Sequence, residues 1–275
     1  MNKEEYFEKI KEYSLLAKKE IGQNFLIDQH VAERIVEEAE ISDGDKVLEI
    51  GCGAGSLTYF LTHSLGTIDA IDIDEAMLTK VKNDFEKAEN IRVFNGNAMR
   101  FDYSPYSLIV GNLPYYITSG IVEKVLLGAN NARLVVFMVQ KEALDRLLAK
   151  PNTKEYGPLA ILIELSGKAT KLFNVSRNSF SPIPHVESAV FKIELNHDVN
   201  LLQDVYRLAE SLFLQRRKTI YNNLKNYLGN GDLAKDILEK NEIEFTTRPE
   251  QLFPSQYLHL CEAIKNSRIS TRHER

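Results

Sequence analysis

The sequence of 275 residues contains only two cysteines, Cys52 and Cys261, which lie far apart along the chain. Neither belongs to a Cys-x-x-Cys or Cys/His spacing, so the sequence predicts no zinc site and no metal cofactor. A chain of this length, 44% apolar, buries a substantial core without disulfide bonds. We expect either one large domain or a large domain with a small one.

Long apolar runs are also missing. No stretch is long and uninterrupted enough to cross a bilayer, and the charged start MNKEEYFEKIKEY lacks the apolar segment of a signal peptide. We therefore expect a cytoplasmic protein without a membrane partner. Positive charge is not in excess either, because the net charge is −5. Any contact with nucleic-acid phosphates thus requires a local basic patch.

Strand-like and helix-like segments alternate through the first half of the chain. Strands are expected at residues 46–50, 67–73, 91–94, 108–110 and 134–139, and helices at 28–40, 57–65, 75–85, 120–127 and 141–149. Asp28 and Asp74 are the expected N-caps of two of these helices. The alternation predicts an α/β fold with a parallel, doubly wound sheet.

The pattern changes after a strand-like segment at residues 188–195. Beyond it only helical periodicity is visible, at residues 205–214, 218–227, 233–240 and 255–265. The sequence therefore predicts a domain of residues 1–197 followed by a small all-helical domain of residues 198–275.

A glycine-rich loop, Glu49-Ile-Gly51-Cys-Gly53-Ala-Gly55, follows the first predicted strand. Residue 56 is serine where a dinucleotide fingerprint has its third glycine. Gly51 and Gly53 allow a ligand to approach the backbone closely, and Glu49 favours a cation such as a sulfonium. Alone, the loop fits a tight βα turn of any α/β protein equally well. Asp72, at the end of the next strand, is placed to bind ribose hydroxyls, so the combination predicts an adenosine-containing cofactor.

The segment Asn112-Leu113-Pro114-Tyr115 follows the strand at residues 108–110. The side-chain oxygen of Asn112 and the carbonyl of Leu113 offer two acceptors for the hydrogens of an exocyclic amine such as adenine N6. Pro114 holds Leu113 in an extended conformation, and Tyr115 offers a face for a flipped base. The pattern favours methylation of a base amine through proximity and orientation. The alternative is a proline-containing turn after a strand.

Five segments occur in a characteristic order: residues 22–26 (GQNFL), 49–55 (EIGCGAG), 112–115 (NLPY), 179–188 (SFSPIPHVES) and 213–219 (FLQRRKT). From about residue 16 to 263 the chain resembles the KsgA family of small-subunit rRNA adenine dimethyltransferases. The resemblance implies a Rossmann-like class I methyltransferase domain, S-adenosylmethionine as cofactor and S-adenosylhomocysteine as product. It also implies N6,N6-dimethylation of two adjacent adenines in a hairpin loop of 16S rRNA.

The resemblance also implies roles for individual residues. Phe180 would stack on the target base opposite Tyr115, although core packing before a proline-rich turn explains Phe180 equally well. Cofactor contacts carry over to Asn24, Leu26, Gly51, Asp72 and Asn112.

Two positions depart from the family pattern. Cys52 stands where proline is usual, which loosens the glycine turn. Asn97 stands where an aspartate usually accepts a hydrogen bond from the adenine amine of the cofactor. The side-chain oxygen of Asn97 still accepts a hydrogen bond but lacks the charge. We keep Asn97 as a binding residue and expect weaker cofactor affinity.

The basic triplet Arg216-Arg217-Lys218 is the predicted contact with the RNA backbone. Without the resemblance, a solvated helix face would explain it better. The triplet belongs to a segment that Erm-type methyltransferases of 23S rRNA usually lack, which favours the small-subunit substrate. An Erm-type activity and a non-catalytic ribosome-assembly factor on the same fold are the alternatives. We expect a monomer that prefers an immature small ribosomal subunit.

Overall fold

The structure, a computed structural model, describes residues 2–17, 23–197 and 199–273, with the backbone alone at 199–200 and 268–273. The chain forms two compact units. The first contains residues 1–144 and 168–196, and the second contains residues 145–167 and 197–275. These units and the predicted division after residue 197 differ mainly in residues 145–167, which pack with the helical unit.

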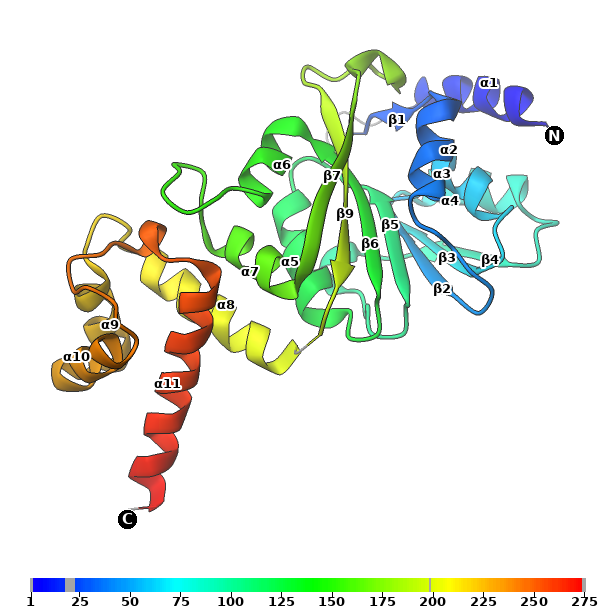
Figure 1. Cartoon of the computed structure of the whole chain (residues 1–275). Coiled ribbons are helices and arrows are strands. Elements are labelled where there is room, and N and C mark those ends of the chain that lie inside the picture. The colour runs from blue at the N-terminus through cyan, green and yellow to red at the C-terminus, as the bar shows by residue number, and fades with distance from the viewer. Residues whose placement is uncertain (1, 18–22, 198, 274–275) are drawn as a thin grey trace. The chain divides into compact units, whose positions relative to one another are not determined.

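The first unit is built on a mixed sheet. Among the described residues, seven strands follow the order β4-β3-β2-β5-β6-β9-β7, and β1 pairs with β8 separately (Figure 1). The strands are β1 Phe25–Leu26, β2 Lys46–Ile50, β3 Thr67–Asp72, β4 Ile91–Asn95, β5 Leu108–Asn112, β6 Leu134–Gln140, β7 Gly167–Val175, β8 Phe180–Ser181 and β9 Ser188–Leu195. Strands β2 to β6 are parallel, whereas β9 is antiparallel to β6. The α/β class is confirmed, but the expectation of a wholly parallel sheet is wrong at β9.

Helices flank this sheet. They are α1 Lys3–Ser14, α2 Gln29–Glu37, α3 Ser56–Leu61, α4 Glu75–Asp84 and α5 Thr118–Gly128, while α6 Lys141–Leu147 spans the division between the units. As predicted, Asp28 and Asp74 cap α2 and α4, accepting hydrogen bonds from backbone N–H groups of the first turn. One sheet face packs against the first three helices in a core that includes Ile10, Ile35, Leu61, Val47, Leu108 and Val136.

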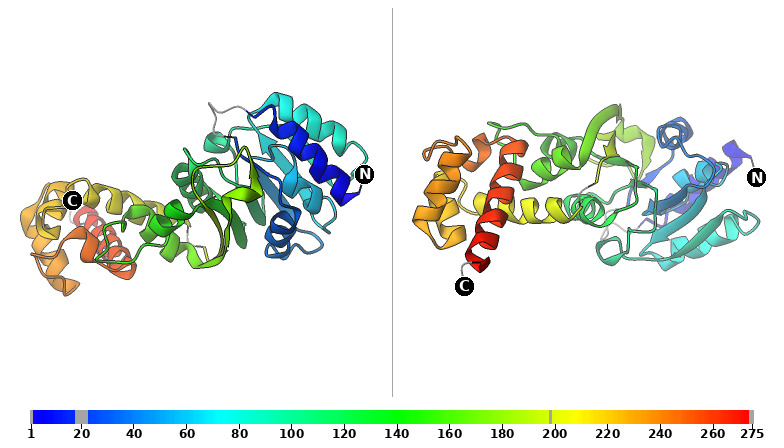
Figure 2. Two further views of the ribbon diagram at one scale, coloured as in Figure 1. Left: turned by 90° about the horizontal axis from the view of Figure 1, so that it is seen from above. Right: turned by 60° about the horizontal axis from the view of Figure 1, so that its bottom comes forward.

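The second unit is helical. It contains α7 Pro158–Ser166, α8 Val199–Phe213, α9 Ile220–Leu228, α10 Gly231–Lys240 and α11 Pro254–His273. Helices α8 to α11, coloured yellow to red, gather into one bundle (Figure 2). Residues 145–167 belong to this unit because Tyr156 and Ile161 are buried in its core, and the Tyr156 hydroxyl donates to the Leu252 carbonyl at 3.0 Å. In the described part of the chain, none of the helices combines the length and apolar character that a membrane span requires.

Candidate functional site

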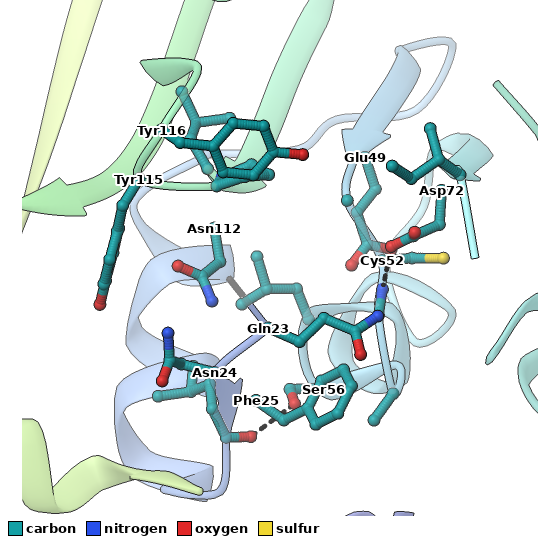
Figure 3. A pocket seen from close by; sticks show the side chains of 18 residues that line it. Gln23, Asn24, Phe25, Glu49, Cys52, Ser56, Asp72, Asn112, Tyr115 and Tyr116 are labelled. Atoms are coloured by element: carbon teal, nitrogen blue, oxygen red, sulfur yellow. Dashed lines mark hydrogen bonds between the residues drawn. The ribbon is translucent and has the colours of Figure 1, made fainter. Parts of the chain in front are cut away.

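A cleft opens at the carboxyl ends of β2, β3 and β5. The strand order reverses here, because β3 lies on one side of β2 and β5 on the other, and ligands of open α/β sheets bind at such a point. The cleft is lined by both apolar and polar side chains, as small-molecule sites usually are. Its lining comes from three segments widely separated in sequence: residues 23–26, 49–57 and 112–116, joined by Asp72 and Ile73 (Figure 3).

The glycine loop forms the floor of the cleft between β2 and α3. Its three glycines have positive φ: Gly51 +72°, Gly53 +51° and Gly55 +87°. At Gly55 an added Cβ would lie 2.3 Å from the hydroxyl oxygen of Tyr6, which itself donates to the Ala54 carbonyl at 3.0 Å. The loop therefore needs glycine at this position for both its backbone angle and its packing.

Asp72 lies at the end of β3, directly beside the glycine loop. Its two carboxylate oxygens accept hydrogen bonds from the backbone N–H groups of Gly53 and Asp74, both at 2.9 Å. Burial raises the pKa of Asp72, although these two backbone hydrogen bonds act in the opposite direction. The structure thus holds the carboxylate in one orientation at the wall of the cleft.

Glu49 is a second acid on the same wall, but it is almost fully buried, with 1% of its surface exposed. Its Oε2 accepts a hydrogen bond from the Thr58 hydroxyl at 2.6 Å. Burial raises the pKa of Glu49 to about 8, and the nearby charge of Asp72 adds to the effect. Glu49 is therefore largely protonated at neutral pH, and a cation in the cleft would favour its ionised form.

The segment after β5 forms the opposite wall. Asn112 is the last residue of β5, and the backbone N–H of Leu113 donates to the Met138 carbonyl at 3.0 Å, which holds the chain against β6. The ring of Tyr115 lines the cleft, and its hydroxyl is hydrogen-bonded to the Ser188 hydroxyl at 3.0 Å. Tyr116 also lines the cleft and is 58% exposed. An amide and two aromatic rings thus border one opening.

The third segment closes the cleft from the N-terminal side. Asn24 and Leu26, both predicted to bind cofactor, line it, and Figure 3 shows the amide groups of Asn24 and Asn112 facing one another. Gln23 donates from Nε2 to the Asp74 carboxylate at 2.9 Å, and the Ser56 hydroxyl donates to the Leu26 carbonyl at 2.5 Å. Gly22, which belongs to the same sequence motif, lies outside the described residues.

Asn97 lines a second cleft that adjoins the first one. The two share Gly51, Asp72, Ile73, Pro114 and Tyr116. The Asn97 side chain accepts a hydrogen bond from the Met99 backbone N–H at 2.9 Å and so begins a short 3₁₀ turn. The other walls of this second cleft are mostly apolar, including Ile50, Ile71, Ala98, Ile117 and Ile121. Its apolar lining with Asn97 at the edge suits a heterocycle with polar edges.

Phe180 is buried away from the lining of the cleft. The side chain is 1% exposed, belongs to the hydrophobic core and pairs with Leu26 across the β1–β8 sheet. It is also absent from the lining of the cleft. The predicted stacking of Phe180 opposite Tyr115 stays a prediction, and the structure shows the ring packed in the core.

The three residues of the basic triplet in the helical unit have different surroundings. Arg216 donates to the backbone carbonyls of Lys154 at 2.6 Å and Thr153 at 2.8 Å, and its Nε lies 3.7 Å from the Glu250 carboxylate. These contacts hold its guanidinium within the unit, and its predicted contact with RNA stays a prediction. Arg217 and Lys218 follow in the same turn and are exposed.

Several residues of the clefts were not predicted from the sequence. Tyr116 and Ile73 are large, exposed and shared by both clefts, and Gln23 anchors the N-terminal segment. The position of Tyr116 directly after the Asn-Leu-Pro-Tyr segment could have indicated it. Cys52, singled out as a departure from the family pattern, lines the first cleft with a buried thiol. Among the described residues, no group of three potential metal ligands is present.

The chain is similar to known proteins over most of its length. The sequence profile of the family described as "Ribosomal RNA adenine dimethylase" matches residues 15–266. Ribosomal RNA small subunit methyltransferase A of Malacoplasma penetrans is 35% identical over 92% of this chain and 93% of its own length. The protein of that name from Geobacillus sp. (strain WCH70) is 35% identical over 94% of both chains.

Two solved structures are similar over most of the chain. A dimethyladenosine transferase from Plasmodium falciparum has a TM-score of 0.76 and 28% identity, covering 87% of this chain and 96% of the other. The 23S rRNA methyltransferase ErmE has a TM-score of 0.66 and 24% identity, covering 88% of this chain and 100% of the other. At that identity, the likeness to ErmE concerns the fold alone.

Proposed function

The chain belongs to the ribosomal RNA adenine dimethylase family, and we propose that the cleft beside β2, β3 and β5 is its site of methyl transfer. The protein is an S-adenosylmethionine-dependent methyltransferase that dimethylates N6 of adenines in small-subunit rRNA. One observation supports the location above all. The amide of Asn112 and the ring of Tyr115 open onto the same cleft as the glycine loop and Asp72.

The residues of the two clefts fit the cofactor. Asp72 accepts one hydrogen bond from Gly53 in the loop and one from Asp74, and each carboxylate oxygen retains a lone pair for a ribose hydroxyl. Asn97 offers a carbonyl oxygen at the edge of an apolar slot that suits adenine. Asn24, Leu26, Gly51 and Glu49 would surround the methionine part. When bound, S-adenosylmethionine supplies a methyl group on a positively charged sulfur.

The positive charge of that sulfur would change the ionisation of Glu49. Its pKa of about 8 means that the buried carboxyl is mostly neutral near pH 7. A cation nearby lowers the pKa of a carboxyl group by stabilising its ionised form. Glu49 would thus supply negative charge when the cofactor binds, while remaining neutral otherwise.

Asn112 and Leu113 would prepare the target amine. The N6 lone pair of adenine is delocalised into the ring, which makes the amine a poor nucleophile. The side-chain oxygen of Asn112 and the backbone carbonyl of Leu113 would each accept one N6 hydrogen and draw the nitrogen toward tetrahedral geometry. Leu113 is suited to this role because its N–H is fixed to Met138 and Pro114 restricts its backbone. No general base is needed, since a methylated ammonium loses its proton readily.

Tyr115 would hold the flipped base. Its ring lines the cleft beside Asn112, and stacking on an aromatic ring contributes roughly 1–3 kcal/mol per base. This contact replaces part of the stacking that the adenine loses when it leaves the RNA helix. Catalysis then consists mainly of placing the amine against the methyl group in the reactive orientation.

The finer features of the substrate extend this proposal. We propose two adjacent adenines in a hairpin loop of an immature small subunit as the target, with the protein acting as a monomer in the cytoplasm. Arg217 and Lys218 are exposed on the helical unit and would contact RNA phosphates. A protein with net charge −5 needs such local contacts to bind RNA.

Labelled S-adenosylmethionine tests the function directly. The purified protein is incubated with small subunits from cells lacking the enzyme, and in parallel with 23S rRNA, and modified bases are identified by mass spectrometry. Dimethyladenine in 16S rRNA is expected. Asn112→Ala should abolish it, whereas Asn131→Ala, an exposed asparagine outside the cleft, should not. Label confined to 23S rRNA would indicate an Erm-type enzyme. Binding of subunits without label would indicate an assembly factor.

A further inference from the structure

Tyr115 is tethered to a buried serine. Its hydroxyl lies 3.0 Å from the hydroxyl of Ser188, and either oxygen is able to donate. Ser188 is 0% exposed and is not among the residues that line the cleft. It cannot touch RNA or cofactor, so any effect on the reaction must pass through Tyr115.

The antiparallel direction of β9 brings this serine to the edge of the sheet where the cleft lies. The parallel strands β5 and β6 end at this edge of the sheet, and an antiparallel neighbour begins there. The register shows it: Asn112 of β5 pairs with Met138 of β6, and Gln140 at the end of β6 pairs with Ser188, the first residue of β9. A hydroxyl on β9 thus reaches the loop that follows β5.

The backbone next to Ser188 is held by two further contacts. The backbone N–H of Lys141 donates to the Glu187 carbonyl at 3.0 Å, continuing the β6–β9 pairing by one residue. The side chains of the same two residues form an ion pair at 3.3 Å. Tyr115, by contrast, lies in a loop, where Pro114 restricts the preceding backbone but leaves the tyrosine ring free to turn about its side-chain bonds.

We propose that Ser188 is a positioning residue that fixes the ring of Tyr115 as the stacking face for the target adenine. The inference rests on the proposed function of the cleft. A hydrogen bond at the hydroxyl fixes the position of the phenolic oxygen and with it the rotation about Cα–Cβ. Because the O–H bond of a phenol prefers the plane of the ring, the same hydrogen bond also favours one orientation of the ring about Cβ–Cγ. Without the tether the ring samples other rotamers, and only a fraction of them presents its face to a base beside Asn112.

The requirement is greatest in the second methyl transfer. After the first transfer the base is N6-methyladenine, which has one N6 hydrogen left for the two acceptors at Asn112 and Leu113. Orientation by stacking then carries more of the positioning. Loss of the tether should therefore slow the second transfer more than the first and increase the share of monomethylated product.

Three variants test this idea. Ser188→Ala removes the tether from the strand, Tyr115→Phe removes it from the ring while keeping the aromatic face, and the third combines both changes. Ser166→Ala is the control, because Ser166 is also buried (1% exposed) and its hydroxyl donates to the Leu162 carbonyl in the helical unit. The measurements are kcat and KM for subunits, the ratio of monomethyl- to dimethyladenine, the Kd for S-adenosylhomocysteine, and the melting temperature.

Each single variant is expected to lose about three- to tenfold in kcat/KM, the range of one hydrogen bond, and to accumulate monomethyladenine. The double variant should be no worse than the more affected single variant, since both changes break the same contact. The Kd for S-adenosylhomocysteine should stay within twofold of the parent, and Ser166→Ala should keep the parent's product ratio.

Two results would overturn the proposal. In the first, the losses of the single variants multiply in the double variant. In the second, Tyr115→Phe keeps the parent's kcat/KM and product ratio, a result that does not depend on how well Ser188→Ala folds. An inactive parent with all substrates would instead refute the proposed function, so the two failures are distinguishable.

Discussion

Gly55 offers a quantitative test of how the first helix supports the cofactor loop. An alanine at this position must adopt φ near +87°, which costs an L-residue about 1–2 kcal/mol. Its Cβ would also meet the Tyr6 hydroxyl at 2.3 Å. Tyr6 has little room to retreat, because it is 1% exposed and its ring is stacked on Tyr59 with 5.1 Å between centroids.

The second part of the cost follows from the hydrogen bond that Tyr6 must give up. Its hydroxyl donates to the Ala54 carbonyl, and a buried polar group left unpaired costs about 1–3 kcal/mol. Gly55→Ala should therefore lower the free energy of unfolding by about 2–5 kcal/mol in total. It should also weaken cofactor binding, since the same loop forms the floor of the cleft.

Gly44→Ala is the matched control for the backbone part. Gly44 has φ +84°, and nothing lies within 4 Å of its added Cβ. It should cost only the backbone contribution of about 1–2 kcal/mol. In the background Tyr6→Phe the clashing oxygen is gone and the nearest remaining contact is with the Phe85 ring at 3.3 Å. Adding Gly55→Ala to this background should therefore cost only slightly more than Gly44→Ala does in the parent.

Urea denaturation of the four variants and the parent, with the Kd for S-adenosylhomocysteine measured alongside, provides the assay. A Gly55→Ala variant that destabilises the protein no more than Gly44→Ala would contradict this prediction, and so would a Tyr6→Phe background that gives no relief. Either result would show that α1 moves away from the loop at little cost.

Three further predictions follow from the sites. The pKa of Glu49 is about 8 in the folded protein and 4.5 ordinarily, so at a pH between these values the folded state binds more protons than the unfolded state. The contribution of Glu49 to stability therefore falls as the pH rises through this range. Glu49→Gln should raise the melting temperature at pH 8.5 and much less at pH 5. Asn97→Asp keeps the turn acceptor for Met99 and adds charge, so titration calorimetry should show about three- to tenfold tighter cofactor binding; an unchanged Kd would contradict the expected role of this position. Arg216→Ala should destabilise the helical unit by about 1–3 kcal/mol in thermal melts. Arg217→Ala should leave stability nearly unchanged and reduce the salt dependence of RNA binding by about one ion. The reverse pattern would identify Arg216 as the RNA contact.

The sequence predicts local structure well where local signals determine it. The bounds of β2 and β9 match the predicted residues 46–50 and 188–195, because both are buried runs bounded by polar or turn residues. Caps follow the same logic, since Asp28 and Asp74 act on N–H groups two or three residues away. The glycine loop and Asp72 come together because the carboxyl ends of adjacent parallel strands share one edge.

Elements whose stability depends on distant partners were missed. β7 was not predicted, because its partly exposed residues alternate poorly between polar and apolar. α7 was missed because a short apolar run after a proline does not distinguish a helix from a buried strand. The antiparallel direction of β9 also depends on how the chain returns to the sheet, which residue periodicity does not encode.

The direction in which a side chain points is harder to predict from the sequence, as Phe180 and Arg216 illustrate. Both lie in motifs whose residue types fit a role at a ligand, yet one ring is buried in the core and one guanidinium is engaged by two carbonyls. A sequence motif shows which residue types occur together. It does not distinguish a residue that contacts the ligand from a residue that holds the contacting residue in place. Arg216 is held by the Lys154 and Thr153 carbonyls, next to the exposed Arg217 and Lys218. Ser188 is hydrogen-bonded to Tyr115. The proposed role of Ser188 is thus an example of a buried motif residue that acts through the cleft-lining neighbour it contacts.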